Sequence, residues 1–404
     1  MSKLFDATRL AALSMAAAGL AVSLGCSKPP SDTSQPGSNT GLGTTEKMGE
    51  KELSASLPLK KAEMLVELPD YCDSPDAMCL LPDGDILVSV PNVNSWVQAV
   101  AKDKLNAQQD PPPLLVRITK DNQVKKYYDP PRHPVTGKAF PFGLCIDPEG
   151  KNLYLADLQW FANMENPGNY SRVLRIPLDE NYNPAGEAVV LIEGMVVANA
   201  VIVRDGYLYV SDTSMVPKKD PKEPLISGVF RVKLTEEGTK LELPLLDDPH
   251  LVATMKSYNP DIGFGADGLT FDSKGNLYCG NFADGTLHKT EFDSDGKPKQ
   301  KEAPIFAKAE FMKSCDGIFC DLSTDKIYVA DSLANAVQVV SPDGSVQTLA
   351  QDAENDGSGG RLDQPSEVLL RGREVIASNI DFPVPGGINQ KWDKPYTISV
   401  IKLD

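Results

Sequence analysis

The chain has 404 residues, a formal net charge of −16 and seven cysteines. A chain of this length corresponds to two or three ordinary domains or to one large all-β unit. Its acidity argues against nucleic acid as a partner, because a polyanion is repelled by an acidic surface.

The N-terminus has the layout of a secretory signal. Lys3 and Arg9 precede an apolar run over residues 10–24, and Gly25-Cys26 follows directly. The run has 15 residues, which is too few to span a bilayer comfortably. Residues 1–25 are therefore expected to be a signal peptide that directs export.

Gly25-Cys26 resembles the bacterial lipobox, and the resemblance implies that cleavage leaves Cys26 as a diacylglycerol-modified anchor. Ser23-Leu24 reverses the usual Leu-Ser order, so an uncleaved signal anchor and plain secretion remain alternatives. All three place the protein outside the cytoplasm. The expected location is the periplasm or the cell exterior, with contact to the membrane through the lipid alone.

Residues 26–60 are rich in Ser, Thr, Gly, Pro and Lys and hold almost no large apolar side chains. Such a segment cannot bury enough surface to fold, so we expect a flexible tether. The folded domain is expected over residues 61–404. Its six cysteines form no C-x-x-C pair, which gives no support to a zinc-finger or redox motif.

A frame of an apolar strand, a tight turn and a second strand recurs through the domain. One copy reads A-D-G-L-T-F-D-S-K-G-N-L-Y-C-G-N, and repetition on this scale is typical of propellers and solenoids. The copies span Pro75–Val90, Pro141–Asp157, Ala198–Asp212, Ala266–Asn281, Cys315–Asp331 and Pro365–Asn379. A third strand of alternating character follows each copy, over Leu114–Lys120, Ser171–Leu178, Ser227–Leu234, Gly285–Phe292, Asn335–Val340 and Ile398–Leu403.

A fourth strand is visible after five of these units but not after the sixth. An unpaired edge in the last blade is costly, and propellers usually close by borrowing a strand from the other terminus. Ala62–Pro69 is the expected donor. The predicted fold is therefore an all-β six-bladed β-propeller whose N-terminal strand closes the last blade. A β-sandwich would also give many short strands, but not this fixed frame.

In such a fold the starts of the six inner strands surround one mouth of the central channel. The aligned residues there are Asp76, Phe142, Asn199, Asp267, Asp316 and Ser366. Carboxylates that converge near an axis repel one another unless they are protonated or bridged by a cation. A donor set made only of oxygen favours Ca²⁺ or Mg²⁺. The alternative is that these Asp and Asn residues only shape the turns that enter the strands.

The D-G-L and D-G-I strand starts, the G-N-L-Y strand and the polar ring resemble the gluconolactonase and regucalcin-like (senescence marker protein-like) propeller family. The resemblance implies a divalent cation on the axis and the opening of lactones or esters. It also implies that the metal ligands are Asp76, Asn199, Asp267 and Asp316. Two of them depart from the family pattern, with Asp for Glu at 76 and Asp for Asn at 267. Ca²⁺ is the first expectation, with Mg²⁺, Mn²⁺ or Zn²⁺ as alternatives.

A hydrolase of this kind needs a group that accepts a proton from water. None of the three histidines falls at a strand start: His288 lies mid-strand, and His133 and His250 lie in polar loops. If the site is catalytic, the base must then be a carboxylate or metal-bound water, and Asp267 or Asp316 is the candidate carboxylate, acting on a small lactone or ester. The competing hypothesis is a non-catalytic binding propeller of NHL type that captures a sugar, peptide or protein ligand at the cell surface.

Long inserts are predicted on the same mouth. The first spans Asn92–Pro113 and contains a short helical stretch, and further inserts carry Trp160 and Trp392. These two indoles, joined by Trp96, are candidates for walls of a ligand pocket. The alternative is that they pack only within the inserts.

The lipid anchor gives a direct test. Replacing Cys26 by Ser removes the sulfur that carries the lipid, so the protein should move from the membrane pellet to the supernatant with its melting temperature unchanged. Fractionation and a thermal melt, with Ser31→Ala as control, check this. A Cys26→Ser variant that still pellets with membranes would show that something else holds the protein there.

Overall fold

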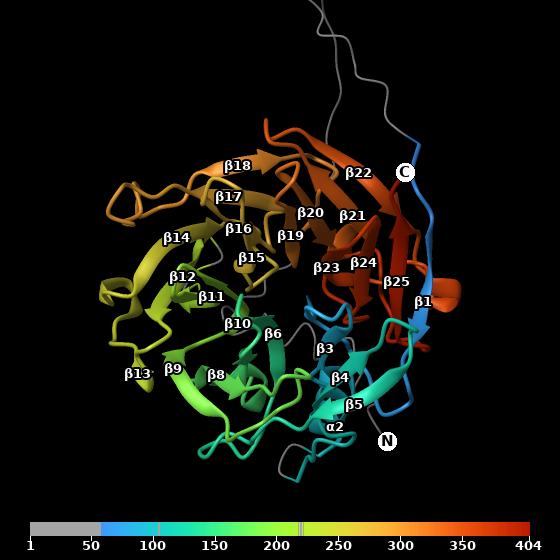
Figure 1. Cartoon of the computed structure of the whole chain (residues 1–404), viewed down its shortest axis with the longest axis horizontal. Coiled ribbons are helices and arrows are strands. Elements are labelled where there is room, and N and C mark those ends of the chain that lie inside the picture. Colours follow the sequence, from blue (N-terminus) through green and yellow to red (C-terminus); the bar gives the residue numbers. More distant parts are fainter. Residues whose placement is uncertain (1–57, 104–105, 217, 219, 221) are drawn as a thin grey trace, which may run out of the picture.

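A computed structural model describes residues 58–103, 106–216, 218, 220 and 222–404. Its strands form six separate sheets arranged around a central axis (Figure 1). The predicted six-bladed propeller is thereby confirmed. Cys26, the signal peptide and nearly all of the tether lie outside the described residues. Within the described part, no helix is both long enough and apolar enough to cross a membrane.

Each blade is built on four antiparallel strands, and in blades one to five the first of these in sequence lies innermost (Figure 1). Blade one contains β2 (Met78–Leu80), β3 (Ile86–Val90), β4 (Leu114–Ile118) and β5 (Val124–Tyr128). Blade two contains β6 (Pro141–Ile146), β7 (Asn152–Asp157), β8 (Ser171–Pro177) and β9 (Val189–Met195). Blade three contains β10 (Ala198–Arg204), β11 (Tyr207–Val216), β12 (Leu225–Lys233) and β14 (Leu251–Ser257).

The second half of the ring repeats this plan. Blade four contains β15 (Ala266–Phe271), β16 (Leu277–Asn281), β17 (Thr286–Thr290) and β18 (Ile305–Lys308). Blade five contains β19 (Ile318–Asp321), β20 (Lys326–Asp331), β21 (Ala336–Val340) and β22 (Val346–Gln351). Blade six contains β23 (Pro365–Arg371), β24 (Glu374–Asn379), β25 (Thr397–Lys402) and β1 (Ala62–Glu67).

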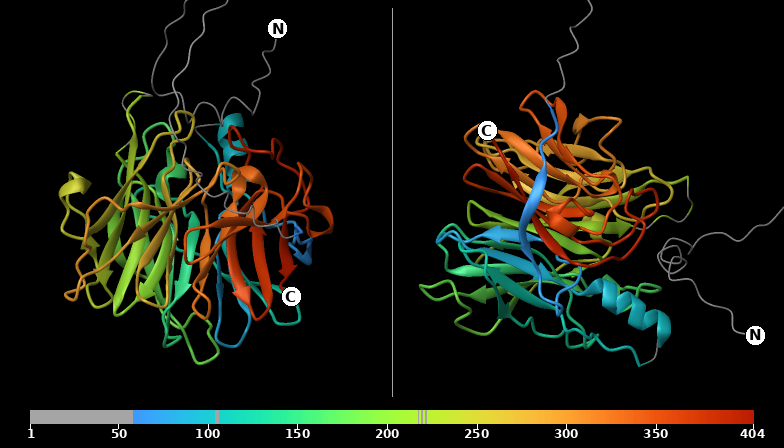
Figure 2. Two further views of the ribbon diagram at one scale, coloured as in Figure 1. Left: turned by 90° about the horizontal axis from the view of Figure 1, so that it is seen from above. Right: turned by 90° about the vertical axis from the view of Figure 1, so that its right-hand side faces the viewer.

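The sixth blade is built from both ends of the described chain. β1 pairs antiparallel with β25, with Ala62 opposite Ile401 and Glu67 opposite Thr397. Just beyond β1, the Leu68 N–H donates to the Tyr396 carbonyl at 2.9 Å. The predicted closing strand is thus confirmed, and it supplies the fourth strand that the last blade would otherwise lack (Figures 1 and 2).

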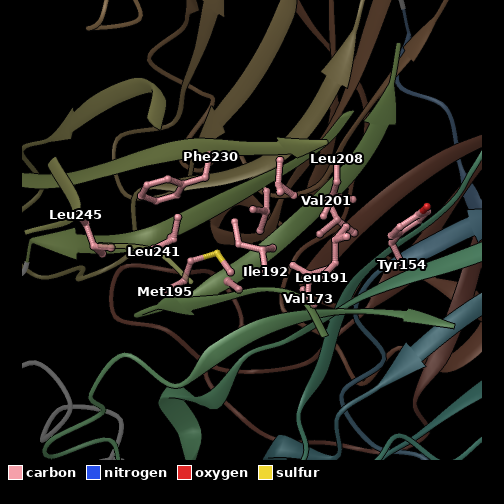
Figure 3. Packing of buried hydrophobic residues seen from close by; sticks show 14 of the residues in the cluster. Tyr154, Val173, Leu191, Ile192, Met195, Val201, Leu208, Phe230, Leu241 and Leu245 are labelled. Carbon is pink, nitrogen blue, oxygen red and sulfur yellow. The ribbon is translucent and has the colours of Figure 1, made fainter. Parts of the chain in front are cut away.

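The apolar core is divided among the interfaces between blades. The cluster in Figure 3 joins blade two, through Val173 and Ile192, to blade three, through Leu208 and Phe230. Comparable clusters lie between the other neighbouring blades. The cluster between blades six and one, which includes Leu68, seals the ring. Every blade therefore depends on both neighbours for burial of its faces.

One strand was not expected from the sequence. β13 (Thr239–Lys240) leaves blade three and pairs in parallel with β9, the outer strand of blade two. Leu241 and Leu245, which follow β13, fill the cluster between these two blades. The connection thus covers an edge that would otherwise be open, which disfavours edge-to-edge association.

The inserts gather at one face of the disc. The predicted helix is present as α2 (Val93–Lys102), which stands at that face in Figure 2. No side chain caps its N-terminus, but one side of the helix is buried through the side chains of Val93, Trp96 and Val97. Short 3₁₀ turns are η1 (Gln159–Ala162), η2 (Leu245–Asp247), η3 (Ser332–Ala334) and η4 (Ser358–Gly360).

The role of β1 leads to a comparison of two truncations. A chain that begins after Pro69 loses five paired positions; at about 1 kcal/mol for each hydrogen bond, its melting temperature should fall by roughly 10 °C or more. A chain that lacks residues 27–50 but keeps β1 should melt like the intact protein. Thermal unfolding compares the two, and equal small shifts would contradict closure by β1.

Candidate functional site

A small cavity of about 90 Å³ opens at the face that carries the inserts. It brings together Asp76, Asn199, Asp267 and Asp316, which come from four different blades. Phe142, the aligned residue of blade two, also lines it. Ser366 does not line it: its hydroxyl lies 3.3 Å from the carbonyl oxygens of Pro75 and Asp76. Five of the six aligned positions therefore meet at one pocket.

Close contact between inner strands holds these residues near the axis. The Gly268 N–H donates to the Asp316 carbonyl at 3.2 Å, and a Cβ at Gly268 would lie only 2.4 Å from that oxygen. The position after the ring is Ala or Gly in five blades: Ala77, Gly143, Ala200, Gly268 and Gly317. Small side chains at this level let neighbouring blades approach closely.

Two of the aspartates are held by polar neighbours. Asn199 Nδ2 donates to Asp267 Oδ1 at 2.7 Å. The Ser332 hydroxyl lies 2.6 Å from Asp316 Oδ2 and 2.5 Å from the Pro365 carbonyl oxygen. A hydroxyl has a single hydrogen, so it can donate fully to only one of these two acceptors at a time. The bond that Ser332 donates to Asp316 favours the ionised carboxylate and partly offsets the effect of burial on the Asp316 pKa.

Burial raises the pKa values of the three aspartates in the pocket. Burial raises the pKa of Asp76 to about 7, and the Ala77 N–H opposes this shift. Burial also places the pKa of Asp267 well above its usual range, and the charge of Asp316 adds to this effect. The pKa of Asp316 is raised by burial and by the charge of Asp76. Without a cation, these carboxyl groups therefore hold protons at pH values where exposed ones do not.

A fourth buried carboxyl group is not among the residues aligned at the six strand starts. Glu367, in β23, occupies the position that is Ala or Gly in the other five blades. A Cβ at Gly317 would lie 2.3 Å from Glu367 Oε1, so that glycine leaves room for the carboxylate. Burial raises the Glu367 pKa well above its usual range, and the charges of Asp76 and Asp316 raise it further. The sequence contains a sign of this residue, because a single Glu stands at a position of the repeated frame that is Ala or Gly in the other five blades.

The donor set fits a hard divalent cation. Asp76, Asn199, Asp267 and Asp316 offer oxygen atoms alone, and no Lys, Arg or His is among the described residues that line the pocket. A cation would relieve the repulsion between these carboxylates. In the described part of the chain, however, no three His, Cys, Asp or Glu side chains are grouped so that they could hold a metal ion.

Phenylalanines, not tryptophans, form the wall of the pocket. Phe161 stacks on Phe142 with centroids 5.6 Å apart, and Phe382 meets Phe161 edge-on at 6.1 Å. The three tryptophans do not line the cavity and pack behind this wall. Trp160 contacts Phe161 and Phe264, and the Trp96 indole donates to the Phe161 carbonyl at 2.9 Å. The indoles therefore support the phenyl rings that form the wall.

No histidine lines the pocket among the described residues. His288 is buried in β17, where Nδ1 lies 2.8 Å from the Ala303 carbonyl oxygen and Nε2 lies 3.0 Å from the Thr286 hydroxyl. His133 is buried against Tyr170 instead of being solvated as its polar loop indicated. Carboxyl groups remain the titratable groups of the pocket.

Solved structures with the same fold include gluconolactonase- and regucalcin-like propellers. A gluconolactonase from Xanthomonas campestris is 13% identical, with a TM-score of 0.53 over 88% of this chain and 94% of that one. A regucalcin from Agrobacterium tumefaciens, described as calcium-binding, is 13% identical, with a TM-score of 0.53 over 87% and 98%. A luciferin-regenerating enzyme is 9% identical, with a TM-score of 0.53 over 85% and 97%.

These similarities show a shared fold. No protein-family model matches the sequence, and no curated protein is similar to it in sequence. The three neighbours are named for different activities, and a propeller supports many functions. The function of this chain must therefore be argued from its pocket.

The raised pKa of Asp76 predicts how stability depends on pH. A carboxyl group whose folded-state pKa is raised from 3.8 to about 7 stabilises the fold below about pH 4, and this contribution is lost as pH rises through 7. In chelator, Asp76→Asn should therefore lose less stability than the wild type between pH 4 and 8, by up to about 4 kcal/mol.

Urea unfolding at several pH values measures this difference. The control is Asp121→Asn, which alters an exposed carboxyl group and should follow the wild-type profile. Parallel profiles for Asp76→Asn and the wild type would show that Asp76 is ionised in the folded protein at neutral pH.

Proposed function

We propose that this protein is a metal-dependent hydrolase of lactones or related esters, exported and held at the membrane by a lipid on Cys26. One observation carries the proposal: buried carboxyl groups from several blades meet beneath an apolar pocket that has no basic residue among its described lining. Such a cluster of buried carboxyl groups lowers stability, and groups with strongly shifted pKa values are concentrated at functional sites. Gluconolactonase and calcium-binding regucalcin on the same fold support this choice.

Asp76, Asn199, Asp267 and Asp316 would hold the cation, with Ca²⁺ as the first expectation and Mg²⁺, Mn²⁺ or Zn²⁺ as alternatives. A divalent cation at this position would supply Lewis-acid polarisation of a carbonyl group. Asn199 orients the Asp267 carboxyl through its 2.7 Å hydrogen bond. Ser332 orients Asp316 in the same way.

Asp267 and Asp316 are also the candidates for proton transfer. A carboxylate at this position would accept a proton from the attacking water and return it to the leaving alkoxide. Both groups lie in the floor of the pocket beside the Phe wall, where apolar side chains limit the access of bulk water.

A second candidate function is a non-catalytic propeller that binds a sugar, peptide or protein at the cell surface. The observation that favours it is that no three acidic, His or Cys side chains of the described chain are grouped to hold a metal. In that case Asp267 and Asp316 would be protonated hydrogen-bond donors to a ligand, and no reaction would follow.

The metal response separates the two functions. If Ca²⁺ binds the folded state only, a hundredfold excess over Kd stabilises the wild type by about 2.7 kcal/mol, or roughly 5 °C in melting temperature. Asp267→Ala and Asp316→Ala should abolish this gain and lower lactone hydrolysis by about 100-fold or more. Ser366→Ala, at an aligned position outside the pocket, should keep the response to the cation.

Thermal melts with Ca²⁺, Mg²⁺, Mn²⁺, Zn²⁺ or chelator, followed by a panel of lactones, give the answer. A wild-type melt that none of these additions moves would contradict the metal site. Binding of a pocket ligand without hydrolysis would then favour the second function.

A further inference from the structure

Among the described residues that line the pocket, Gln364 carries a buried side-chain amide oxygen that accepts no hydrogen bond. Gln364 is 3% exposed and lines the cavity. Its Oε1 is buried and has no hydrogen-bond partner among the described residues. A buried acceptor without a partner lowers stability, and a ligand that donates a hydrogen bond to this oxygen would offset a cost that the described residues leave uncompensated.

The backbone at Gln364 is also unusual. Its φ of 56° lies in the left-handed region, which residues other than Gly rarely adopt. The conformation is held from both sides: the Gln364 N–H donates to Asn335 Oδ1 at 2.6 Å, and its carbonyl accepts the Ile380 N–H at 3.1 Å. Strain maintained in this way is typical of binding and catalytic sites.

Other polar groups of the pocket are already engaged. The Thr213 hydroxyl donates to the Ala266 carbonyl at 2.7 Å, and the Asn199 amide donates to Asp267. Within the described lining, Gln364 Oε1 is the buried side-chain atom that lacks a hydrogen-bond partner. The remainder of the lining is apolar, with five aliphatic side chains and the five phenyl groups of Phe142, Phe161, Phe264, Phe282 and Phe382.

We propose that the pocket selects a small, mainly apolar lactone or ester that carries one hydrogen-bonding substituent, which meets Gln364. The proposal rests on the proposed hydrolase function and names its substrate class. A sugar lactone brings several hydroxyl groups, and each one that is buried against phenyl rings without a partner weakens binding. Each buried methylene group instead strengthens binding.

The size of the cavity points the same way. At about 90 Å³ it is well below the roughly 300–1,000 Å³ of pockets that enclose drug-sized ligands. A five- or six-membered ring with a short substituent is the scale of ligand expected. The carbonyl group of such a ring would face Asp267 and Asp316, while its substituent would reach Gln364.

The test compares three substrates on the full chain: δ-hexalactone, a δ-lactone with one hydroxymethyl group, and glucono-δ-lactone. The hydroxymethyl lactone should give the highest kcat/KM, at least about 10-fold above glucono-δ-lactone. Gln364→Leu should lower kcat/KM for the hydroxymethyl lactone about 10-fold and leave δ-hexalactone nearly unchanged. A merely structural role for Gln364 would lower both equally. Gln347→Leu, at an exposed position, is the matched control.

Gln364→Gly guards against a folding failure, because it removes the amide and accepts the positive φ without strain. It should show the same substrate selectivity as Gln364→Leu. A preference of the wild type for glucono-δ-lactone would overturn the proposed substrate class while leaving a lactonase function intact.

Binding separates this inference from the hydrolase function itself. Non-hydrolysable lactams corresponding to the three lactones are added in thermal melts. The hydroxymethyl lactam should raise the wild-type melting temperature most, and Gln364→Leu should lose that advantage. If no lactone is hydrolysed but this pattern holds, the pocket specificity stands and the hydrolase function fails. If no lactam shifts the melt, the substrate class is wrong.

Discussion

The pairing of β1 with β25 holds together the two ends of the described chain, and the site depends on it. Asp76 belongs to the first blade, whereas Gln364 and Glu367 belong to the sixth. Because the ring is closed, Asp76 and Gln364 line the same pocket and the charge of Asp76 raises the pKa of Glu367. At the junction, the Ser378 hydroxyl lies 2.5 Å from the Asp76 carbonyl oxygen, which ties blade six to the strand start of blade one. Closure thus converts residues far apart in sequence into neighbours.

The acidic centre works against the stability of the same ring. Burial and mutual repulsion raise the pKa of Asp267, Asp316 and Glu367, so ionising these groups costs free energy. The six apolar clusters between blades provide the stability that tolerates this cost. Residues that break the rules of a buried core in this way are expected mainly where a protein has a function.

The inserts decide what reaches the acidic centre. α2 contributes Val93 to the pocket and η1 contributes Phe161, while Trp96 and Trp160 pack behind. These segments come from the loops between second and third strands, which the propeller frame does not constrain. Proteins with the same fold can therefore share an acidic centre and still differ in the molecules that they admit.

The sequence by itself determined the number of blades, the closing strand and the aspartates at the strand starts, because a repeated frame places equivalent residues at equivalent points of a ring. It also contained Glu367, as one Glu among small residues, although alignment on the neighbouring position hid it. Only the tertiary structure decided that phenylalanines face the cavity and tryptophans do not, since the packing of inserts depends on contacts between distant loops. The open amide of Gln364 belongs to this second group. Whether a buried acceptor finds a partner is set by every chain segment around it, and no local pattern of residues records that.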